Sequence, residues 1–239
     1  MKYGKGALLV TLLWYIVAAG IRSPIVPMPH AVVLHLCTGQ HIGVFSIHVL
    51  ASLYRIIIGV SLGLSVAIPV GFIIGRKKIV DNLVSPMLYL LFPLPKIAFL
   101  PVFMVLFGIG DASKITLIAV IVFFPAALSI RDGVKQISTE YLELARAYHL
   151  TPKQMLRHIL WPAVLPRICS SVRITVGIAL SVLFINESYA ASHGLGYAIM
   201  NSWVMAQYTS MYAGIVLLSL LGLLLYWVID LVEHRVIQR

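Results

Sequence analysis

Long apolar runs, separated by short charged segments, fill most of the chain. The clearest run lies between Arg55 and Arg76: it holds no charged side chain and ends at the basic triplet Arg76-Lys77-Lys78. A membrane-spanning helix needs about 20 mostly apolar residues, so this run predicts a span. Its basic end is expected in the cytoplasm, because Lys and Arg collect in cytoplasmic loops. Similar runs cover residues 6–21, 114–130, 162–184 and 211–229.

A further apolar segment, residues 81–110, is interrupted by prolines at positions 86, 93, 95 and 101. Proline removes a backbone donor and clashes with the preceding turn, so this span is predicted to be kinked or interrupted. The pattern as a whole predicts an all-α, polytopic membrane protein with about six transmembrane helices and both termini inside. Residues 1–239 are interpreted as a single transmembrane domain, and the segment Ser23–His48 as an outer, solvated or interfacial loop.

Composition supports a membrane protein. The chain is 60% hydrophobic and 11% charged, whereas a soluble domain carries about 25% charged residues. The net charge of +10 would suggest nucleic acid in a soluble protein. Here the basic residues lie mainly at the predicted inner ends, with Arg22 and Lys114 as the two clear outer exceptions, which is the distribution of a multi-pass protein in a lipid bilayer. No nucleic-acid partner is expected.

The longest polar segment, residues 132–161, falls between the fourth and fifth predicted spans. Ser138 is placed to cap a short helix over Thr139–Tyr148. Thr151, Pro152 and Gln154 then form the pattern of a capping box with proline at the first helical position, which predicts a second helix. The segment is therefore expected to project into the cytoplasm as a helix, a tight corner and another helix.

This segment resembles the coupling loop, or EAA loop, of ABC importer permeases. The resemblance is carried by Glu143-Leu144-Ala145 and by the run from Leu160 to Pro166. The runs 93–101 and 107–114, and Glu187 followed by Gly194-Leu195-Gly196-Tyr197, are similar to the sulfonate/nitrate/taurine permease branch. The resemblance implies the membrane-spanning permease subunit of an ATP-driven importer in the cytoplasmic (inner) membrane of a prokaryote. It also implies a homodimer, a cytoplasmic ATP-binding subunit, and an extracytoplasmic substrate-binding protein that delivers a small polar solute, such as an organic sulfonate, a nitrate-like anion or a vitamin precursor.

In that family the short coupling helix docks into a groove on the ATPase. Glu143 and Ala145 are accordingly expected on a solvated helix face that fits this groove. His149 stands where the family usually has glycine, a position that suits the left-handed end of a helix. Histidine is among the residues that tolerate this conformation best, so the corner is expected to keep its shape. The resemblance thus implies these ATPase-coupling residues: Glu143, Leu144, Ala145, His149, Leu150, Thr151 and Pro152.

Four charged residues, Arg55, Lys96, Arg173 and Glu187, lie in or near the predicted spans, where a charge costs at least about 2.5 kcal/mol on insertion scales. Arg55 and Arg173 are expected to snorkel towards a helix end. Lys96 either serves the translocation pathway or bonds to carbonyls freed by the prolines. Glu187 belongs either to the pathway or to an outer loop, and Tyr197 either to the pathway or to an interfacial aromatic belt. The candidate pathway residues are Lys96, Arg173, Glu187 and Tyr197.

Other functions find little support in the sequence. The stretch from Gly108 to Lys114 lacks the spacing of a phosphate-binding loop, so the chain is not expected to be an enzyme; ATP and Mg would be bound by the partner ATPase, with no cofactor or metal in this chain. Cys37 and Cys169 fall on opposite predicted sides of the membrane, so no disulfide is expected. The alternative function is a secondary transporter, which would need intramembrane coupling carboxylates, usually within repeated halves. No repeat is evident.

Overall fold

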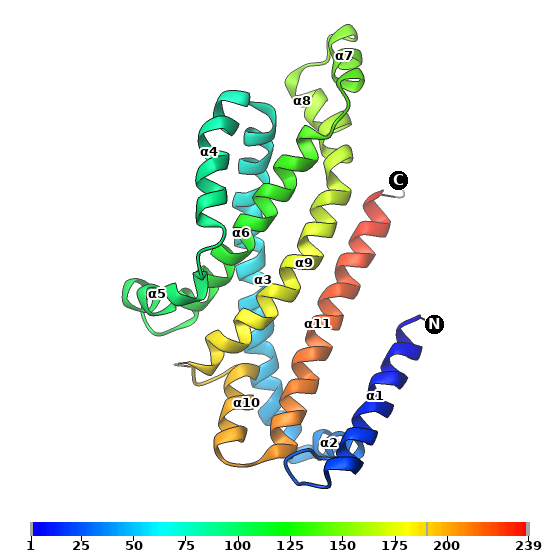
Figure 1. The fold of residues 1–239 in the computed structure, drawn as a ribbon, viewed down its shortest axis with the longest axis vertical. Helices are drawn as coiled ribbons and strands as arrows, with labels where there is room; N and C mark the ends of the chain where they lie inside the picture. The colour runs from blue at the N-terminus through cyan, green and yellow to red at the C-terminus, as the bar shows by residue number, and fades with distance from the viewer. Residues whose placement is uncertain (1, 190, 238–239) are drawn as a thin grey trace. The chain divides into compact units, whose positions relative to one another are not determined.

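The computed structural model describes residues 2–189 and 191–237, which form helices and their connections (Figure 1). Met1, Ala190 and residues 238–239 of the predicted domain lie outside the described residues. The chain divides into two compact units, one comprising the chain up to Tyr54 with Leu183–Leu221, the other Arg55–Val182 with the chain from Gly222. The helices are α1 (Lys2–Ile21), α2 (Pro29–Cys37), α3 (Gly39–Arg76), α4 (Lys78–Leu91), the 3-10 turn η1 (Lys96–Phe99), α5 (Leu100–Phe107), α6 (Asp111–Lys135), α7 (Thr139–Ala147), α8 (Pro152–Met155), the π-helical turn η2 (Leu156–Leu160), α9 (Trp161–Ser188), α10 (Leu195–Val204) and α11 (Tyr208–Ile237).

Among the described residues, five helical segments are long and apolar enough to cross a membrane. They lie on α1, α3, α6, α8 to α9, and α11. A sixth candidate span is broken: α4 and the η1–α5 segment meet at an angle of 84°. Pro93 and Pro95 occupy this break, so the predicted interruption is confirmed. Helices suit this environment because they satisfy their backbone hydrogen bonds internally. The all-α, polytopic class with about six spans is confirmed.

The segment Ser23–His48 corrects one prediction. It was expected to be an outer loop, but α2 occupies much of it and α3 begins within it at Gly39, well before the predicted start at Arg55. From Pro29 to His48 the helical backbone is interrupted only at Thr38, between α2 and α3, and no proline occurs between Pro29 and Pro69. Pro29 itself stands in the first turn of α2, where its missing N–H costs nothing. The predicted span was therefore shorter than α3, because its start was assigned from the charged residue Arg55 alone.

In the unit that contains Arg55–Val182, α3 packs directly against α6 along a stripe of small residues at every fourth position. These residues are Gly59, Gly63, Ala67, Gly71 and Gly75. A Cβ atom added at any of the four glycines would lie 2.6–2.8 Å from an atom of α6, closer than real Cβ contacts allow. Small residues at this spacing let two helix backbones approach closely, which is how membrane helices gain packing contacts. We call this contact the α3–α6 seam.

A hydrophobic cluster lies beside the seam where α6 ends and α9 begins. Its buried members are Phe72, Ile130, Val134, Leu160, Val164 and Ile168. In the other unit, Trp14 of α1 stacks on Tyr212 of α11 with ring centroids 5.5 Å apart, and its indole N–H donates to the carbonyl of Pro27 at 3.1 Å. Each unit therefore has its own core.

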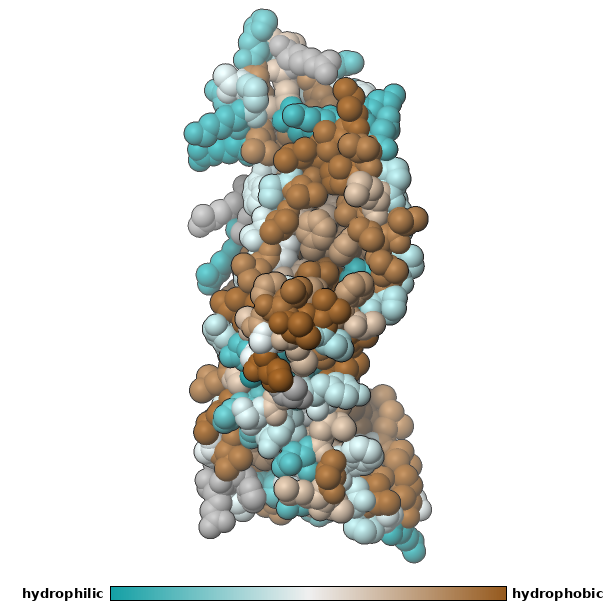
Figure 2. Space-filling view, turned by 90° about the vertical axis from the view of Figure 1, so that its left-hand side faces the viewer, coloured by the Kyte–Doolittle hydropathy of each residue, from teal (hydrophilic) through white to brown (hydrophobic). Residues whose placement is uncertain are grey.

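Many large hydrophobic side chains are exposed on α1, α3, α9 and α11. Figure 2 shows hydrophobic residues over much of the visible face, the side of α4 and α5, whereas hydrophilic ones gather at the end that carries α7 and α8. A soluble protein rarely exposes contiguous apolar patches of this kind. The surface therefore suits contact with lipid, with α7 and α8 in water.

Candidate functional site: the helical corner and the buried polar groups

The corner between α6 and α9 begins with a capped helix. Ser138 Oγ accepts a hydrogen bond from the backbone N–H of Glu140 at 3.3 Å, and α7 follows over Thr139–Ala147. Glu140 lies in the first turn, where its charge complements the positive helix end. The predicted cap and helix are confirmed, the helix ending one residue earlier than expected.

His149 forms the turn that ends α7. Its φ angle is 50°, in the left-handed region. The backbone N–H of Leu150 donates to the carbonyl of Ala145 at 3.0 Å, which is the long bond of a Schellman motif. The expectation that histidine adopts the conformation usually supplied by glycine at this position is confirmed.

The second helix begins at the predicted capping box. Thr151 Oγ1 accepts from the backbone N–H of Gln154 at 3.4 Å, and Gln154 Oε1 accepts from the backbone N–H of Thr151 at 2.9 Å. Pro152 occupies the first helical position. The short α8 continues through the π-helical turn η2 into α9 without a gap, so the corner is joined directly to a long helix.

The two sides of α7 differ in burial, and this corrects one expectation. Ala145 is only 1% exposed, so its methyl group faces inward and does not present a surface to a partner. Leu142 lies on the same inward side, and with Met155 of α8 it packs on the hydrophobic cluster below. Glu143 is exposed as expected. The outward side carries Tyr141 and Leu144 of α7 and Tyr148 just after its end, which are 61%, 53% and 73% exposed.

Beside the start of the corner, a buried carboxylate joins α4 to α6. Asp81 is 6% exposed and accepts a hydrogen bond from Arg131 Nε at 2.7 Å. Lys135, one turn further along α6, also pairs with Asp81, and Ser85 Oγ donates to it at 2.5 Å. Two cations and a hydroxyl satisfy this acid, which explains how it can be buried. The cluster fixes the end of α6 from which the corner projects.

Lys96 bonds to backbone carbonyls at the broken span. Its ammonium donates to the carbonyls of Phe92 at 2.6 Å and Leu91 at 3.3 Å, and lies 4.6 Å from the ring centroid of Phe124. These carbonyls belong to the last turn of α4, which the following prolines leave without helical donors. The sequence left two interpretations of Lys96, a place in the translocation pathway or bonds to carbonyls freed by the prolines. The structure shows the bonds to the carbonyls.

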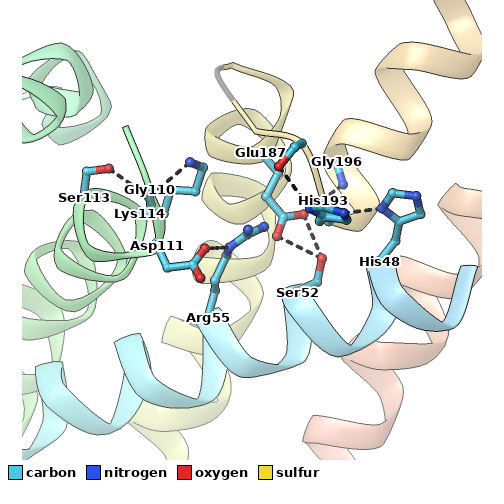
Figure 3. A network of polar contacts seen from close by, with 12 residues as sticks. His48, Ser52, Arg55, Gly110, Asp111, Ser113, Lys114, Glu187, His193 and Gly196 are labelled. Carbon is cyan, nitrogen blue, oxygen red and sulfur yellow. Dashed lines mark hydrogen bonds and ion pairs between the residues drawn. The ribbon is translucent and has the colours of Figure 1, made fainter. Parts of the chain in front are cut away.

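The two arginines expected to snorkel are instead ion-paired. Arg55 is 6% exposed and its Nε donates to Asp111 at 2.7 Å (Figure 3). Arg173 of α9 contacts two acids of α11, Asp230 at 2.5 Å and Glu233 at 2.6 Å. Pairing removes the need to reach the interface, because a partner offsets the cost of leaving water. Lys114, expected on the outer side, is 1% exposed and donates to the carbonyl of Gly110 at 3.2 Å.

Glu187, at the end of α9, is fully buried, so it is not part of an outer-surface loop. Ser52 of α3 lies 2.9 and 2.8 Å from its two carboxylate oxygens, and the backbone N–H of Gly196 donates to it at 2.9 Å (Figure 3). Gly194 lies against this carboxylate with a φ of 129°, and a Cβ there would overlap it. The carboxylate thus holds the start of α10 against α3.

The neighbouring histidine completes this arrangement. His48 Nδ1 accepts a hydrogen bond from the backbone N–H of Gly194 at 3.1 Å, and the imidazole lies 5.8 Å from the half-buried ring of Tyr197. Glu187 and Tyr197 are therefore brought to one face of α3, beside Ser52 and His48. Lys96 and Arg173, in the other unit, each have different partners.

Sequence reasoning missed several of these groups. Asp81 was not singled out, although Arg131 and Lys135 are spaced by one helical turn and indicate a shared anionic partner. The small residues from Gly59 to Gly75 show an explicit four-residue repeat that marks a helix–helix contact. Nothing local in the sequence indicates that His48 and Ser52 face Glu187, which lies 135 residues beyond Ser52.

Long apolar helices, one broken span and an exposed helical corner define a polytopic membrane protein. Residues 67–238 match the family model of binding-protein-dependent transport system inner membrane components. The chain belongs to this family and is the permease component of an ABC importer, a multi-pass protein of the inner membrane. Membership of this family excludes the alternative interpretation, a secondary transporter.

Similar proteins support the assignment over nearly the whole length. The chain is 29% identical to SsuC of Bacillus subtilis strain 168, described as an aliphatic sulfonates transport permease protein, over 99% of this chain and 88% of SsuC. It is 31% identical to the taurine transport system permease protein TauC of Escherichia coli K12, over 94% of this chain and 84% of TauC. A chain of the inward-facing MetNI methionine ABC transporter shares the fold with a TM-score of 0.70 at 22% identity, covering 83% of this chain and 99% of that chain.

Proposed function

We propose that the corner formed by α7 and α8 is the coupling element that docks on a separate cytoplasmic ATPase. The observation that carries this proposal is the exposed stripe of Tyr141, Leu144 and Tyr148. Tyr141 and Leu144 share one side of α7. Tyr148 follows the last residue of α7 and continues this side, because its backbone N–H still donates to the carbonyl of Leu144 at 3.0 Å. An exposed apolar stripe on a capped helix in water is typical of a protein–protein contact.

The opposite side of α7 supports the same role. Leu142 and Met155 anchor the two short helices on the core, and Ala145 packs inward beneath the exposed stripe. A force on the stripe therefore acts on a corner that is fixed to α6 and α9. Of the coupling residues implied by the resemblance, Glu143 and Leu144 present the docking surface. Ala145, His149, Leu150, Thr151 and Pro152 shape the corner.

The test compares Leu144→Asp with Leu144→Met, two changes at one exposed position. Leu144→Asp should weaken capture of the ATPase subunit at least about tenfold, because burying a leucine is worth about 1.5–3 kcal/mol. Substrate-stimulated ATP hydrolysis and uptake should fall with it, while Leu144→Met, which keeps the apolar contact, should retain both. Membrane insertion should be normal in both variants. Full uptake by a correctly inserted Leu144→Asp protein would contradict the docking role.

The assembly is inferred to contain two copies of this chain, two ATPase subunits and an extracytoplasmic binding protein. Each chain carries one coupling corner, and the phosphate-binding loop is absent from its sequence. We infer that both termini lie in the cytoplasm, because basic residues gather near the inner ends of the predicted spans. Native mass spectrometry of the solubilised complex checks the stoichiometry; an active monomer without ATPase would contradict it.

The transported solute is inferred to be a small organic sulfonate. This rests on SsuC and TauC, whose names specify aliphatic sulfonates and taurine and whose similarity covers nearly the whole chain. Calorimetric titration of the binding protein encoded beside this permease, with taurine, an alkanesulfonate, nitrate and a pyrimidine vitamin precursor, decides the question. Heat with the sulfonates alone supports the assignment, and binding of only nitrate or only the precursor contradicts it.

A further inference from the structure

An apolar groove runs along the last turns of α3 and faces the start of α9. Its volume is about 560 Å³. All of its lining residues belong to the unit that contains Arg55–Val182. They are Ile68, Pro69, Phe72, Ile73, Arg76, Lys77, Leu156 and Trp161.

The spacing of the α3 residues gives the groove a direction. The pairs 68–69 and 72–73 and the last residue of α3, Arg76, recur every four residues, so they occupy one face of the helix. Lys77 follows directly, in extended backbone between α3 and α4. The two pairs are apolar, whereas Arg76, at the C-terminal end of α3, and the adjacent Lys77 are cationic. At a rise of about 1.5 Å per residue, the apolar wall extends for about 12 Å before the cations. The groove is therefore amphipathic along its length.

Trp161 indicates the depth of the groove in a membrane. Its ring stacks on Phe72 with centroids 6.0 Å apart, and it is 38% exposed. Tryptophan is enriched at the level of the lipid headgroups, where its ring is partly in hydrocarbon and partly in water. The apolar wall then lies at acyl-chain depth, and the two cations lie at the level of the phosphates.

The two cations are available for an anion. Arg76 and Lys77 are exposed, and over residues 2–189 and 191–237 no carboxylate forms an ion pair with either. The guanidinium of Arg76 contacts the sulfur of Met155 at 3.5 Å, which leaves its charge uncompensated. Lys78 belongs to the same basic run but does not line the groove.

We propose that this groove binds one anionic phospholipid, with an acyl chain along the apolar wall and the phosphate on Arg76 and Lys77. Basic pockets beside membrane helices at the cytoplasmic side are the sites that recognise anionic headgroups. A zwitterionic lipid is a poorer fit, because its ammonium group meets the same two cations. Leu156 belongs to the π-helical turn between α8 and α9, so the bound lipid contacts the base of the corner. This ligand is additional to the transported solute.

The test is native mass spectrometry of the detergent-solubilised protein titrated with phosphatidylglycerol or with phosphatidylcholine of the same acyl chains. One phosphatidylglycerol per chain should be retained. Lys77→Gln should weaken its binding about fivefold, because each basic residue near a membrane surface is worth about 1 kcal/mol. Lys78→Gln, which removes the same charge one residue away and outside the groove, is the matched control and should leave the affinity unchanged.

A second pair of variants tests the apolar wall. Ile73 and Leu62 are both on α3 and both 49% exposed, but only Ile73 lines the groove. Ile73→Trp should fill the groove and abolish the retained lipid, whereas Leu62→Trp should not. Equal retention of phosphatidylcholine, equal effects of the two lysine variants, or an unchanged lipid count in Ile73→Trp would each overturn the proposal. Loss of a chain–chain contact in Ile73→Trp with the lipid still bound would also overturn it, by assigning the groove to a second copy.

Discussion

At the scale of single residues, His149 shows how one backbone angle fixes the corner. Its φ of 50° is tolerated by histidine, but a β-branched side chain there is a steric outlier. We predict that His149→Val loosens the turn by at least about 1 kcal/mol, whereas His149→Gly preserves it. Hydrogen exchange of the Leu150 amide, which is bonded to the carbonyl of Ala145, should accelerate about fivefold or more in the valine variant only. Equal exchange rates in the wild type and both variants would show that the left-handed φ angle at position 149 does not determine the stability of the turn.

Glu187 is a second residue whose neighbours depend on it. Removing its carboxylate leaves the Ser52 hydroxyl and the Gly196 N–H without this buried acceptor, which costs about 1–3 kcal/mol. Thermal stability in detergent should therefore fall in the order wild type, Glu187→Gln, Glu187→Ala, since glutamine keeps one oxygen acceptor. An alanine variant as stable as the glutamine variant would show that these bonds contribute little to stability.

At the scale of elements, the α3–α6 seam gives a prediction with a control on the same helix. A Cβ at Gly63 would lie 2.7 Å from the carbonyl oxygen of Ala119, whereas one at Gly43 meets nothing within 4 Å. Gly63→Ala must separate the helices and should cost about 1–3 kcal/mol. Gly43→Ala should be neutral or stabilising by up to about 1 kcal/mol, because alanine favours helix. The measurement is the melting temperature of each variant in detergent. Equal melting temperatures would mean that α3 and α6 can move apart at little cost in stability.

Among these elements, the local features could be predicted from the sequence and the distant contacts could not. The caps at Ser138 and Thr151 and the break at Pro93 were predictable, because each depends on side chains a few residues from the backbone they affect. The partners of Arg55 and Arg173 were not, because they lie 56 and 57 residues away and only packing brings them together. The burial of Ala145 was not predicted either, because it depends on the hydrophobic cluster beneath α7, which only the packing of distant segments creates.

At the scale of the whole molecule, the two cysteines bear on the orientation in the membrane. Cys37 is exposed and Cys169 is buried, so only Cys37 is a useful reporter in the native protein. With both termini inside, an impermeant maleimide applied to spheroplasts should label Cys37. In a Cys37→Ser background it should label Lys153→Cys, on the exposed surface of α8, only after permeabilisation. Cys169 should stay unlabelled until the protein is denatured, and outside labelling at position 153 would reverse the proposed orientation.

The α3–α6 seam also limits how this permease changes shape. Because the glycines recur every four residues, one helix can slide along the other only by a full repeat, about 6 Å, with the backbones first moving apart. Packed contacts of this kind have few alternative arrangements and do not deform continuously. From Arg55 to its end, α3 is therefore expected to travel with α6 as a rigid body throughout transport. The internal degrees of freedom of this unit then lie at joints outside the seam, such as the 84° break between α4 and the η1–α5 segment.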